Sequence, residues 1–246
     1  AVVVATTTIE VKRLDMALDS FDDQYQGCGP AMTAALPALK RSEFQKKCLF
    51  AQVWKEAAAE WQRRAPPVSP LSPDQATAIM AFSIEIYDFF NNIVHNAGHS
   101  PQEYRDNFHF KTLHFLLTDA LATLRDARKG HCLDVFRQYC GVRFEAKPGN
   151  SMRFGEFFIM SLSKITESNC TVETLFQVHT CHGAAIQFFL ERPEHQWVLI
   201  PPFETFEVTK VTREGGVTQI QLNSTGTFSK YNCEWLRGDT TGDSLG

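Results

Sequence analysis

The sequence predicts an α+β fold, because helical and strand patterns occupy different parts of the chain. Over 32–63 and 108–125, apolar residues recur every three or four positions, which is the period of an amphipathic helix. After Gly130, short alternating apolar runs are separated by Gly, Pro and Asn turns, which is typical of strands. Helices followed by strands, without regular alternation of the two, indicate the α+β class.

The chain of 246 residues is long enough to bury its own core, and we expect a single domain over 1–246. We expect residues 1–130 to form a mainly helical lobe, 131–237 a β core, and 238–246 a flexible tail. The proline-rich stretch 65–73 is a rigid connector, because too little chain precedes it to form a separate core.

The helical half contains recognisable breaks and caps. We expect the first long helix to break near 40–42, and the stretch 74–96 to be helical with short breaks. Ser100 is placed to cap a further helix, with Pro101 at its first position and Glu103 three residues after the cap.

The second half contains short segments of strand type. The expected strands are 135–137, 142–144, 152–154, 157–162, 174–181, 184–189, 197–200, 205–211, 217–223 and 230–235. The strand at 197–200 must stop at Pro201 and Pro202, because proline has no N–H to donate to a sheet.

Charge and hydropathy exclude several classes of partner. The net charge is −4 and no run of like charges stands out, so we expect no nucleic-acid partner. No apolar run reaches the roughly 18 residues of a membrane span. The chain is therefore expected to be a soluble monomer.

The cysteine pattern indicates an oxidising compartment. Seven cysteines are scattered without a C-x-x-C pair of the zinc-binding kind, and their odd number leaves at least one outside any internal disulfide. Sequons begin at Asn169 and Asn223, which agrees with a secretory route and predicts glycans there. We expect an extracellular protein, either secreted or held at the cell surface.

The two ends of the chain fit this location. The start has no basic leader, as in a mature secreted protein whose signal peptide has been removed. The end is polar and small, and is either a natural terminus or the approach to a GPI-anchor signal beyond it. A lipid anchor to the membrane through a missing C-terminus is therefore one expected partner.

Short phrases that follow one another in a fixed order cover most of the chain. They include Leu14-Asp15-Met16-Ala17, Ser20-Phe21-Asp22-Asp23-Gln24-Tyr25, Phe110-Lys111-Thr112-Leu113-His114-Phe115, Arg153-Phe154-Gly155, Thr174-Leu175-Phe176 and Val198-Leu199-Ile200-Pro201-Pro202-Phe203-Glu204. In these phrases the chain resembles the vertebrate ecto-mono-ADP-ribosyltransferases, which split NAD and transfer ADP-ribose to protein side chains. The resemblance implies the ADP-ribosyltransferase fold, a helical N-terminal lobe packed on two crossed, mainly antiparallel β-sheets with the NAD cleft between them.

The resemblance also implies two disulfides and a catalytic signature. The implied pairs are Cys28–Cys233 and Cys132–Cys181, and the state of Cys48, Cys140 and Cys170 stays open. In the family, an arginine anchors the NAD phosphate and a serine holds the geometry of the site. A glutamate stabilises the positive charge that develops as nicotinamide leaves. In arginine-specific members, an acid two residues before that glutamate activates the acceptor.

This chain keeps the arginine of the signature and departs from it elsewhere. Arg137 matches the arginine, whereas Ile159 stands at the first serine and only Ser161 remains of the serine phrase. Trp197 occupies the position of the catalytic glutamate, and His195 that of the acceptor-activating acid. No intact catalytic set is therefore expected at these positions.

Three other acids lie near the lost position. Because strand side chains alternate, Glu194 is expected to face away from the side of Trp197, and Glu156 is out of phase with Ile159. Glu204 lies beyond two prolines and matches a glutamate that the family already has there. Losing one electrostatic partner costs about 10² to 10³ in rate, so we expect ordinary transferase activity to be absent.

The first hypothesis is an extracellular pseudoenzyme that needs no cofactor and has an apolar cleft. Its expected ligand-binding residues are Phe158, Ile159, Met160 and Trp197, with Arg137 and His195 beside them. They would suit a hydrophobic or cationic small molecule through stacking and cation–π contacts. The same apolar residues also fit a cleft that is simply filled by core.

The alternative hypothesis is an active enzyme, either a mono-ADP-ribosyltransferase or an NAD glycohydrolase. In it, Arg137 works with His195 or Glu156 in new roles, and NAD is the cosubstrate.

A third hypothesis, a metal site of His179, His182 and His195 with free cysteines, is not favoured. The first two of these histidines would lie on opposite faces of a strand. Cys181, between them, is expected in a disulfide, so no metal is expected.

Overall fold

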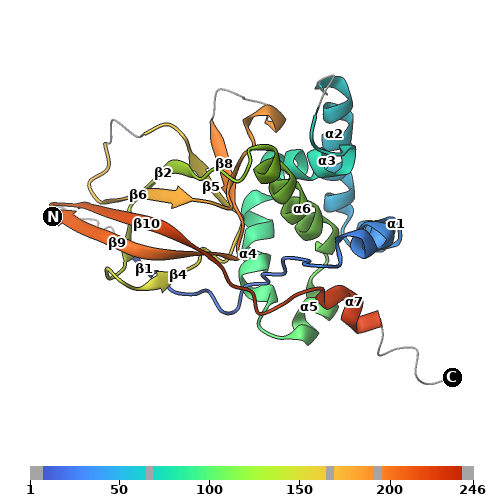
Figure 1. The fold of residues 1–246 in the computed structure, drawn as a ribbon, viewed down its shortest axis with the longest axis horizontal. Coiled ribbons are helices and arrows are strands. Elements are labelled where there is room, and N and C mark those ends of the chain that lie inside the picture. The colour runs from blue at the N-terminus through green and yellow to red at the C-terminus, as the bar shows by residue number, and fades with distance from the viewer. Residues whose placement is uncertain (1–7, 65–68, 165–168, 191–195, 240–246) are drawn as a thin grey trace, which may run out of the picture.

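A computed structural model describes residues 8–64, 69–164, 169–190 and 196–239. Helices and strands separate along the chain as the sequence predicts, and Figure 1 shows them on opposite sides of the molecule. The prediction of an α+β fold is confirmed.

The helical half has one break fewer than its sequence pattern predicts. The helices are α1 (Gly29–Lys46), α2 (Cys48–Arg64), α3 (Pro73–Ala81), the π-helical turn η1 (Phe82–Ile86), α4 (Tyr87–Ala97), α5 (Pro101–Asn107) and α6 (Lys111–Ala127). The predicted break near 40–42 is wrong, because α1 continues to place the buried Glu43 against the start of α6. There its carboxylate accepts the backbone N–H groups of Lys111 and Thr112 at 2.6 and 2.8 Å. The predicted cap is confirmed, since Ser100 Oγ accepts the N–H of Glu103 at 3.1 Å.

The strands form two sheets. They are β1 (Glu10–Arg13), β2 (Leu133–Cys140), β3 (Val142–Glu145), β4 (Ser151–Met152), β5 (Phe158–Ser161), β6 (Glu173–Thr180), β7 (Ala184–Ala185), β8 (Trp197–Ile200), β9 (Glu204–Glu214) and β10 (Val217–Thr227). β1 pairs with β3, and the other strands follow the order β4-β9-β10-β6-β2-β5-β8-β7. Only one residue pair, Phe136 with Ser161, joins β2 to β5. The larger sheet is therefore two groups of strands that meet at this one point.

Two of the predicted strands are wrong. The segment 184–189 is a strand for two residues and then a 3-10 turn, Gln187–Phe189. The segment 230–235 pairs with no sheet, because Asp22 and Asp23 accept its backbone N–H groups. It leads into α7 (Glu234–Asp239), so the predicted flexible tail 238–246 begins as helix, and 240–246 lie outside the described residues.

Two apolar cores meet at β5 and β8. One lies among the helices and includes Leu199 and Ala184, and the other lies among the strands and includes Met160 and Val198. Because side chains alternate along a strand, neighbouring residues of β5 and β8 belong to different cores.

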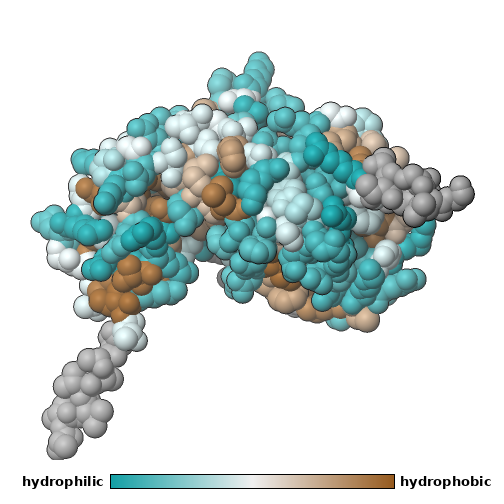
Figure 2. All heavy atoms as spheres, turned by 90° about the horizontal axis from the view of Figure 1, so that it is seen from below, coloured by the Kyte–Doolittle hydropathy of each residue, from teal (hydrophilic) through white to brown (hydrophobic). Residues whose placement is uncertain are grey.

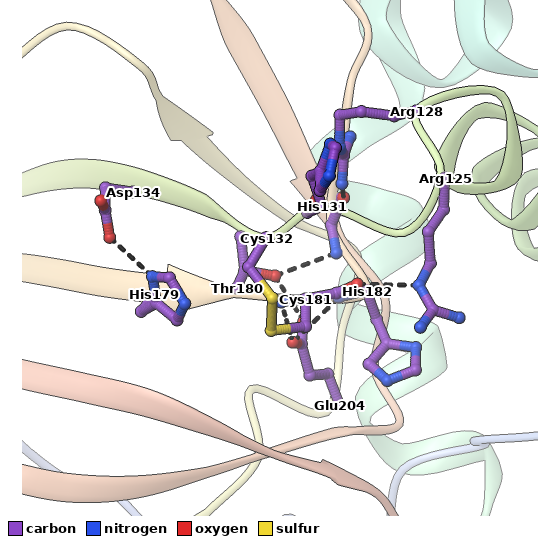
Figure 3. The surroundings of a disulfide bond; sticks show 11 residues. Arg125, Arg128, His131, Cys132, Asp134, His179, Thr180, Cys181, His182 and Glu204 are labelled. Atoms are coloured by element: carbon purple, nitrogen blue, oxygen red, sulfur yellow. Dashed lines mark hydrogen bonds and ion pairs between the residues drawn. A yellow bond between two sulfur atoms is a disulfide. The ribbon is translucent and has the colours of Figure 1, made fainter.

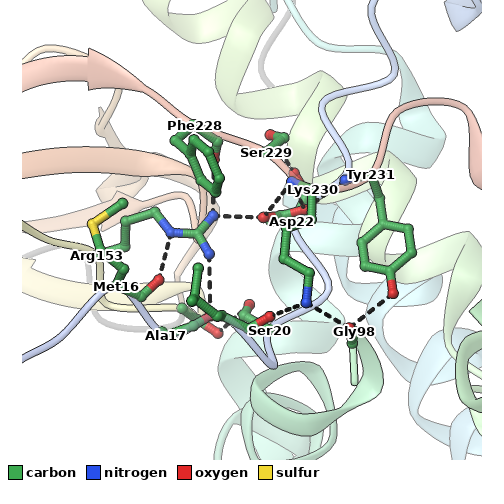
Figure 4. A network of polar contacts seen from close by, with 12 residues as sticks. Met16, Ala17, Ser20, Asp22, Gly98, Arg153, Phe228, Ser229, Lys230 and Tyr231 are labelled. Carbon is green, nitrogen blue, oxygen red and sulfur yellow. Dashed lines mark hydrogen bonds and ion pairs between the residues drawn. The ribbon is translucent and has the colours of Figure 1, made fainter. Parts of the chain in front are cut away.

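A buried ion pair fixes the segment that precedes α1. Arg153 Nη1 donates to Asp22 Oδ2 at 2.6 Å, and both side chains are fully buried. The same guanidinium donates to the backbone carbonyls of Met16, Ala17 and Phe228 (Figure 4). Asp22 also accepts the backbone N–H groups of Lys230 and Tyr231. The pair therefore joins the N-terminal segment, the β half and the segment after β10.

Disulfides reinforce these connections. The described part of the chain contains Cys28–Cys233, Cys132–Cys181 and Cys140–Cys170. The first two are the pairs that the family resemblance implies. The third joins two of the cysteines whose state the sequence leaves open, and Cys48 is free and exposed.

No helix among the described residues is long and apolar enough to cross a bilayer. The face shown in Figure 2 is mainly hydrophilic, with apolar patches between polar side chains.

Replacing Arg153 by methionine is expected to lower the free energy of unfolding by about 3–5 kcal/mol, because the Asp22 carboxylate stays buried without its cation. Urea unfolding with the disulfides intact measures this difference. The matched control is Arg143→Met, whose guanidinium lies 3.7 Å from the half-exposed Glu145 and whose loss should cost less than about 1 kcal/mol. Equal losses in the two variants would contradict the role given to the buried pair.

Candidate active site

Arg137 lies where β2 and β5 separate. Its guanidinium carbon is 4.6 Å from the ring centroid of Tyr139 and 4.7 Å from that of Phe158. Nη1 donates to the carbonyl of Ile159 at 2.7 Å and to the hydroxyl of Tyr87, on α4, at 3.1 Å. Within the described residues, the hydrogen bonds of this guanidinium involve Nη1 alone, so Nε and Nη2 remain to bind an anion.

A second cation lies close to Arg137. Both Arg137 and Lys164 line a cavity of about 120 Å³, together with Phe136 and Gln177. An anion that enters this cavity meets two positive side chains, and Arg137 is already oriented by its stacking and hydrogen bonds.

Glu156 is the acid that the structure places beside Arg137. Burial raises the pKa of this half-buried carboxyl to about 7, although the positive charges of Arg137 and Lys12 oppose the shift. Glu156 lines a cavity of about 410 Å³ with Tyr139 and Phe158, the two rings that enclose Arg137. A carboxyl with a pKa near neutrality in a cavity is a candidate general acid or base.

The sequence places Glu156 out of phase with Ile159, and the alternative hypothesis pairs Glu156 with Arg137. In the structure, Glu156 lies close enough to Arg137 for the two charges to interact, and it shares a cavity with Phe158, over whose ring Arg137 lies. The spacing of residues along one strand does not predict this proximity, because Arg137 and Glu156 lie on different segments of the chain.

The apolar residues predicted to form one pocket belong to two different apolar clusters. Phe158 and Met160 belong to the core among the strands, whereas Ile159 and Trp197 are half-buried and pack on the helical core. The alternation of side chains along β5 separates them. Ser161 pairs with Trp197 across β5 and β8, and its hydroxyl accepts the N–H of Ser163 at 3.0 Å.

The other candidate residues have different roles or lie outside the described residues. Glu204 is fully buried and accepts hydrogen bonds from Thr180 Oγ1 at 2.6 Å and from the N–H groups of Cys181 and His182 at 2.7 and 3.0 Å. It anchors a turn and is not available to a substrate. His195 and Glu194 lie outside the described residues.

His179 and His182, two histidines of the hypothetical metal site, have different surroundings. His179 pairs with Asp134, whereas His182 lines a different cavity of about 290 Å³ with Arg125. Among the described residues, these two histidines share no candidate metal cluster.

The family model for NAD:arginine ADP-ribosyltransferases matches residues 14–230. The chain belongs to this family. It is 45% identical over 229 residues to the erythroblast NAD(P)(+)-arginine ADP-ribosyltransferase of Gallus gallus, covering 91% of this chain and 76% of the relative. It is 42% identical over 238 residues to the GPI-linked NAD(P)(+)-arginine ADP-ribosyltransferase 1 of Mus musculus, with coverages of 91% and 73%.

Solved structures agree with this membership. The crystal structure of the mono-ADP-ribosyltransferase ART2.2 matches with a TM-score of 0.77 and 33% identity, covering 90% of this chain and 98% of that one. The ADP-ribosyltransferase fold implied by the sequence is confirmed. The chain contains disulfides, and its family includes GPI-linked enzymes. Both observations indicate an extracellular or cell-surface location.

Because the pKa of Glu156 is raised, the contribution of this residue to the free energy of unfolding is expected to depend on pH. The folded-state pKa of about 7 lies above the ordinary value of 4.5, so this contribution is fully present in acid and is lost as the pH rises through 7. Relative to Glu156→Gln, the wild-type chain should lose about 2 kcal/mol of unfolding free energy between about pH 5 and about pH 8. Urea unfolding at the two pH values measures it.

The control for this experiment is Glu214→Gln, at the exposed end of β9. Its difference from the wild-type chain should stay constant over the same pH range. If the difference in unfolding free energy between Glu156→Gln and the wild-type chain also stayed constant with pH, the raised pKa of Glu156 would be contradicted.

Proposed function

We propose that the chain binds NAD or NADP at Arg137 and cleaves it with Glu156 as the acidic group, passing ADP-ribose to a guanidino acceptor or to water. The observation that carries this proposal is the pairing of a preoriented Arg137 with a carboxyl whose pKa is about 7. The named activity of relatives at 45% and 42% identity supports the choice of cosubstrate and acceptor.

Arg137 and Lys164 are the groups that bind the pyrophosphate. Arginine forms forked hydrogen bonds with phosphate oxygens, and lysine adds a point charge. Both side chains line the same cavity, so one phosphate group can contact both.

Glu156 supplies negative charge where positive charge develops as nicotinamide leaves. Near neutral pH this carboxyl is ionised in a large fraction of molecules, because its pKa is about 7. A carboxylate in a partly dry site stabilises an oxocarbenium-like state more strongly than one in water. The fraction that is protonated lowers the rate, so activity should rise as the pH increases through 7.

Binding of the dinucleotide need not depend on an acid at position 197. An ART2.2 variant with isoleucine in place of a glutamate has been solved in complex with NAD, and it matches this chain with a TM-score of 0.75 and 32% identity. In that relative, NAD binds without the replaced glutamate. Loss of an acid does not by itself prevent dinucleotide binding in this fold.

A second candidate function is an ADP-ribosyltransferase fold without transfer. The observation that favours it is that Ile159 and Trp197, which stand at the family's serine and glutamate, pack on the helical core. The cavity of about 410 Å³, which is lined by Tyr139, Phe154 and Phe158, would then bind a small apolar or cationic molecule.

Labelled NAD distinguishes the two functions. The wild-type chain should release nicotinamide, and Glu156→Gln should release it about 10² to 10³ times more slowly while binding NAD with the same affinity in calorimetry. Glu214→Gln is the control carboxylate and should match the wild-type chain. Binding of NAD without release, unchanged by Glu156→Gln, would contradict the enzymatic proposal and favour the second function.

A further inference from the structure

Four side chains of metal-binding type form a square on one face of the β2–β6 ladder. Asp134 pairs with His179 in this ladder, and Cys132 and Cys181, one step beyond its end, are joined by a disulfide. Since alternate residues of a strand share a face, positions 132 and 134 lie beside positions 181 and 179. Figure 3 shows the imidazole of His179 between the Asp134 carboxylate and the sulfur atoms.

The distances in this square suit a single metal ion. Ligand atoms of Cys132, His179 and Cys181 lie within 4.8 Å of one another. Around tetrahedral Zn²⁺, with bonds of about 2.0–2.3 Å, ligand atoms lie roughly 3–4 Å apart, so small side-chain rotations bring all three to one ion.

Asp134 prepares the histidine for this role. His179 Nδ1 lies 2.8 Å from Asp134 Oδ1. A carboxylate on one ring nitrogen fixes the tautomer of a histidine and leaves the other nitrogen to bind a metal. This arrangement is the usual support of a zinc-bound histidine.

We propose that reduction of the Cys132–Cys181 disulfide converts this square into a zinc site, with Cys132, His179 and Cys181 as protein ligands and Asp134 behind the histidine. An external dithiol gives two electrons and two protons to the disulfide and leaves as its own disulfide. Zn²⁺ then displaces the two thiol protons and binds both thiolates. The metal and the disulfide exclude each other, so the site is gated by the redox state.

The surroundings favour this chemistry. Arg125 Nε donates to the carbonyl of Cys181 at 2.9 Å, and Arg128 Nη2 donates to that of Gly183 at 2.9 Å. These two bonds hold the backbone at Cys181 and Gly183 in place. The side chain of His179 is 44% exposed, so reductant and metal reach the site from solvent.

The turn that carries Cys181 does not depend on the disulfide. The carboxylate of Glu204 accepts the N–H groups of Cys181 and His182 at 2.7 and 3.0 Å. These bonds hold the backbone of the turn when the sulfur atoms separate, which keeps the ligands close together.

Cobalt binding to the full chain tests the site, because Co²⁺ bound by thiolates has a characteristic absorption. Before reduction the chain should show no thiolate–cobalt band. After treatment with a phosphine reductant it should bind one Co²⁺ per chain with this band, and Zn²⁺ should displace the cobalt. A reduced chain without the band would overturn the proposal.

Variants separate this site from the other thiols that reduction exposes. His179→Ala should weaken Co²⁺ binding at least about tenfold, and Asp134→Asn should weaken it about 10- to 100-fold while leaving all three ligands in place. The matched control is His131→Ala, next to Cys132, which should bind like the wild-type chain. Equal affinity in all of these variants would overturn the proposal, whether or not the reduced chain keeps its fold.

Alkylation gives a second readout from the same samples. In the reduced chain, Zn²⁺ should slow the alkylation of Cys132 and Cys181, as mapped by mass spectrometry. The exposed Cys48 is an internal control and should react at the same rate with and without zinc. If the reduced chain binds Zn²⁺ but the alkylation of Cys132 and Cys181 is not slowed, the proposed site is rejected.

Discussion

The ion pair between Arg153 and Asp22 is the constraint on which the two halves of the molecule depend. It has no solvent contact, and its partners lie on segments 131 residues apart in the sequence. Next to it, Ser20 Oγ donates to the carbonyl of Gly155 at 2.7 Å. Gly155 has a φ of +68°, and a Cβ there would lie 2.4 Å from that of Ala17. Only glycine permits so close an approach of the two segments.

This constraint reaches the candidate active site through the start of β5. Glu156 follows Gly155 directly, and on its other side Asn91 forms two hydrogen bonds with the backbone of Phe157, at 2.8 and 3.0 Å. The backbone of Glu156 is therefore held from both sides by contacts that lie outside the cavity. Such support is needed to keep a partly buried carboxyl beside Arg137, because burial disfavours its charge.

The sequence predicts those parts of the structure that depend on local pattern. The strand at 197–200 is found at those residues, because an apolar run and two prolines define it locally. The segment 230–235 has a similar local pattern, but two distant aspartates take its N–H groups and a helix follows. At the site, the family phrase points to Arg137, and the alternative hypothesis names Glu156 beside it. The sequence does not predict that these two side chains lie close together, because they belong to different segments and no periodicity within one strand relates them.

The two disulfides implied by the family resemblance constrain the chain to different extents. Cys28–Cys233 joins residues 205 apart and closes a loop that includes most of the protein. Cys132–Cys181 joins residues 49 apart, but the β2–β6 ladder already pairs Leu133 with Thr180 beside it. A disulfide stabilises chiefly by limiting the unfolded chain, and the longer loop gains more. The ladder pairs the neighbours of Cys132 and Cys181 independently of their bond, and the redox-gated zinc site proposed above requires this independence.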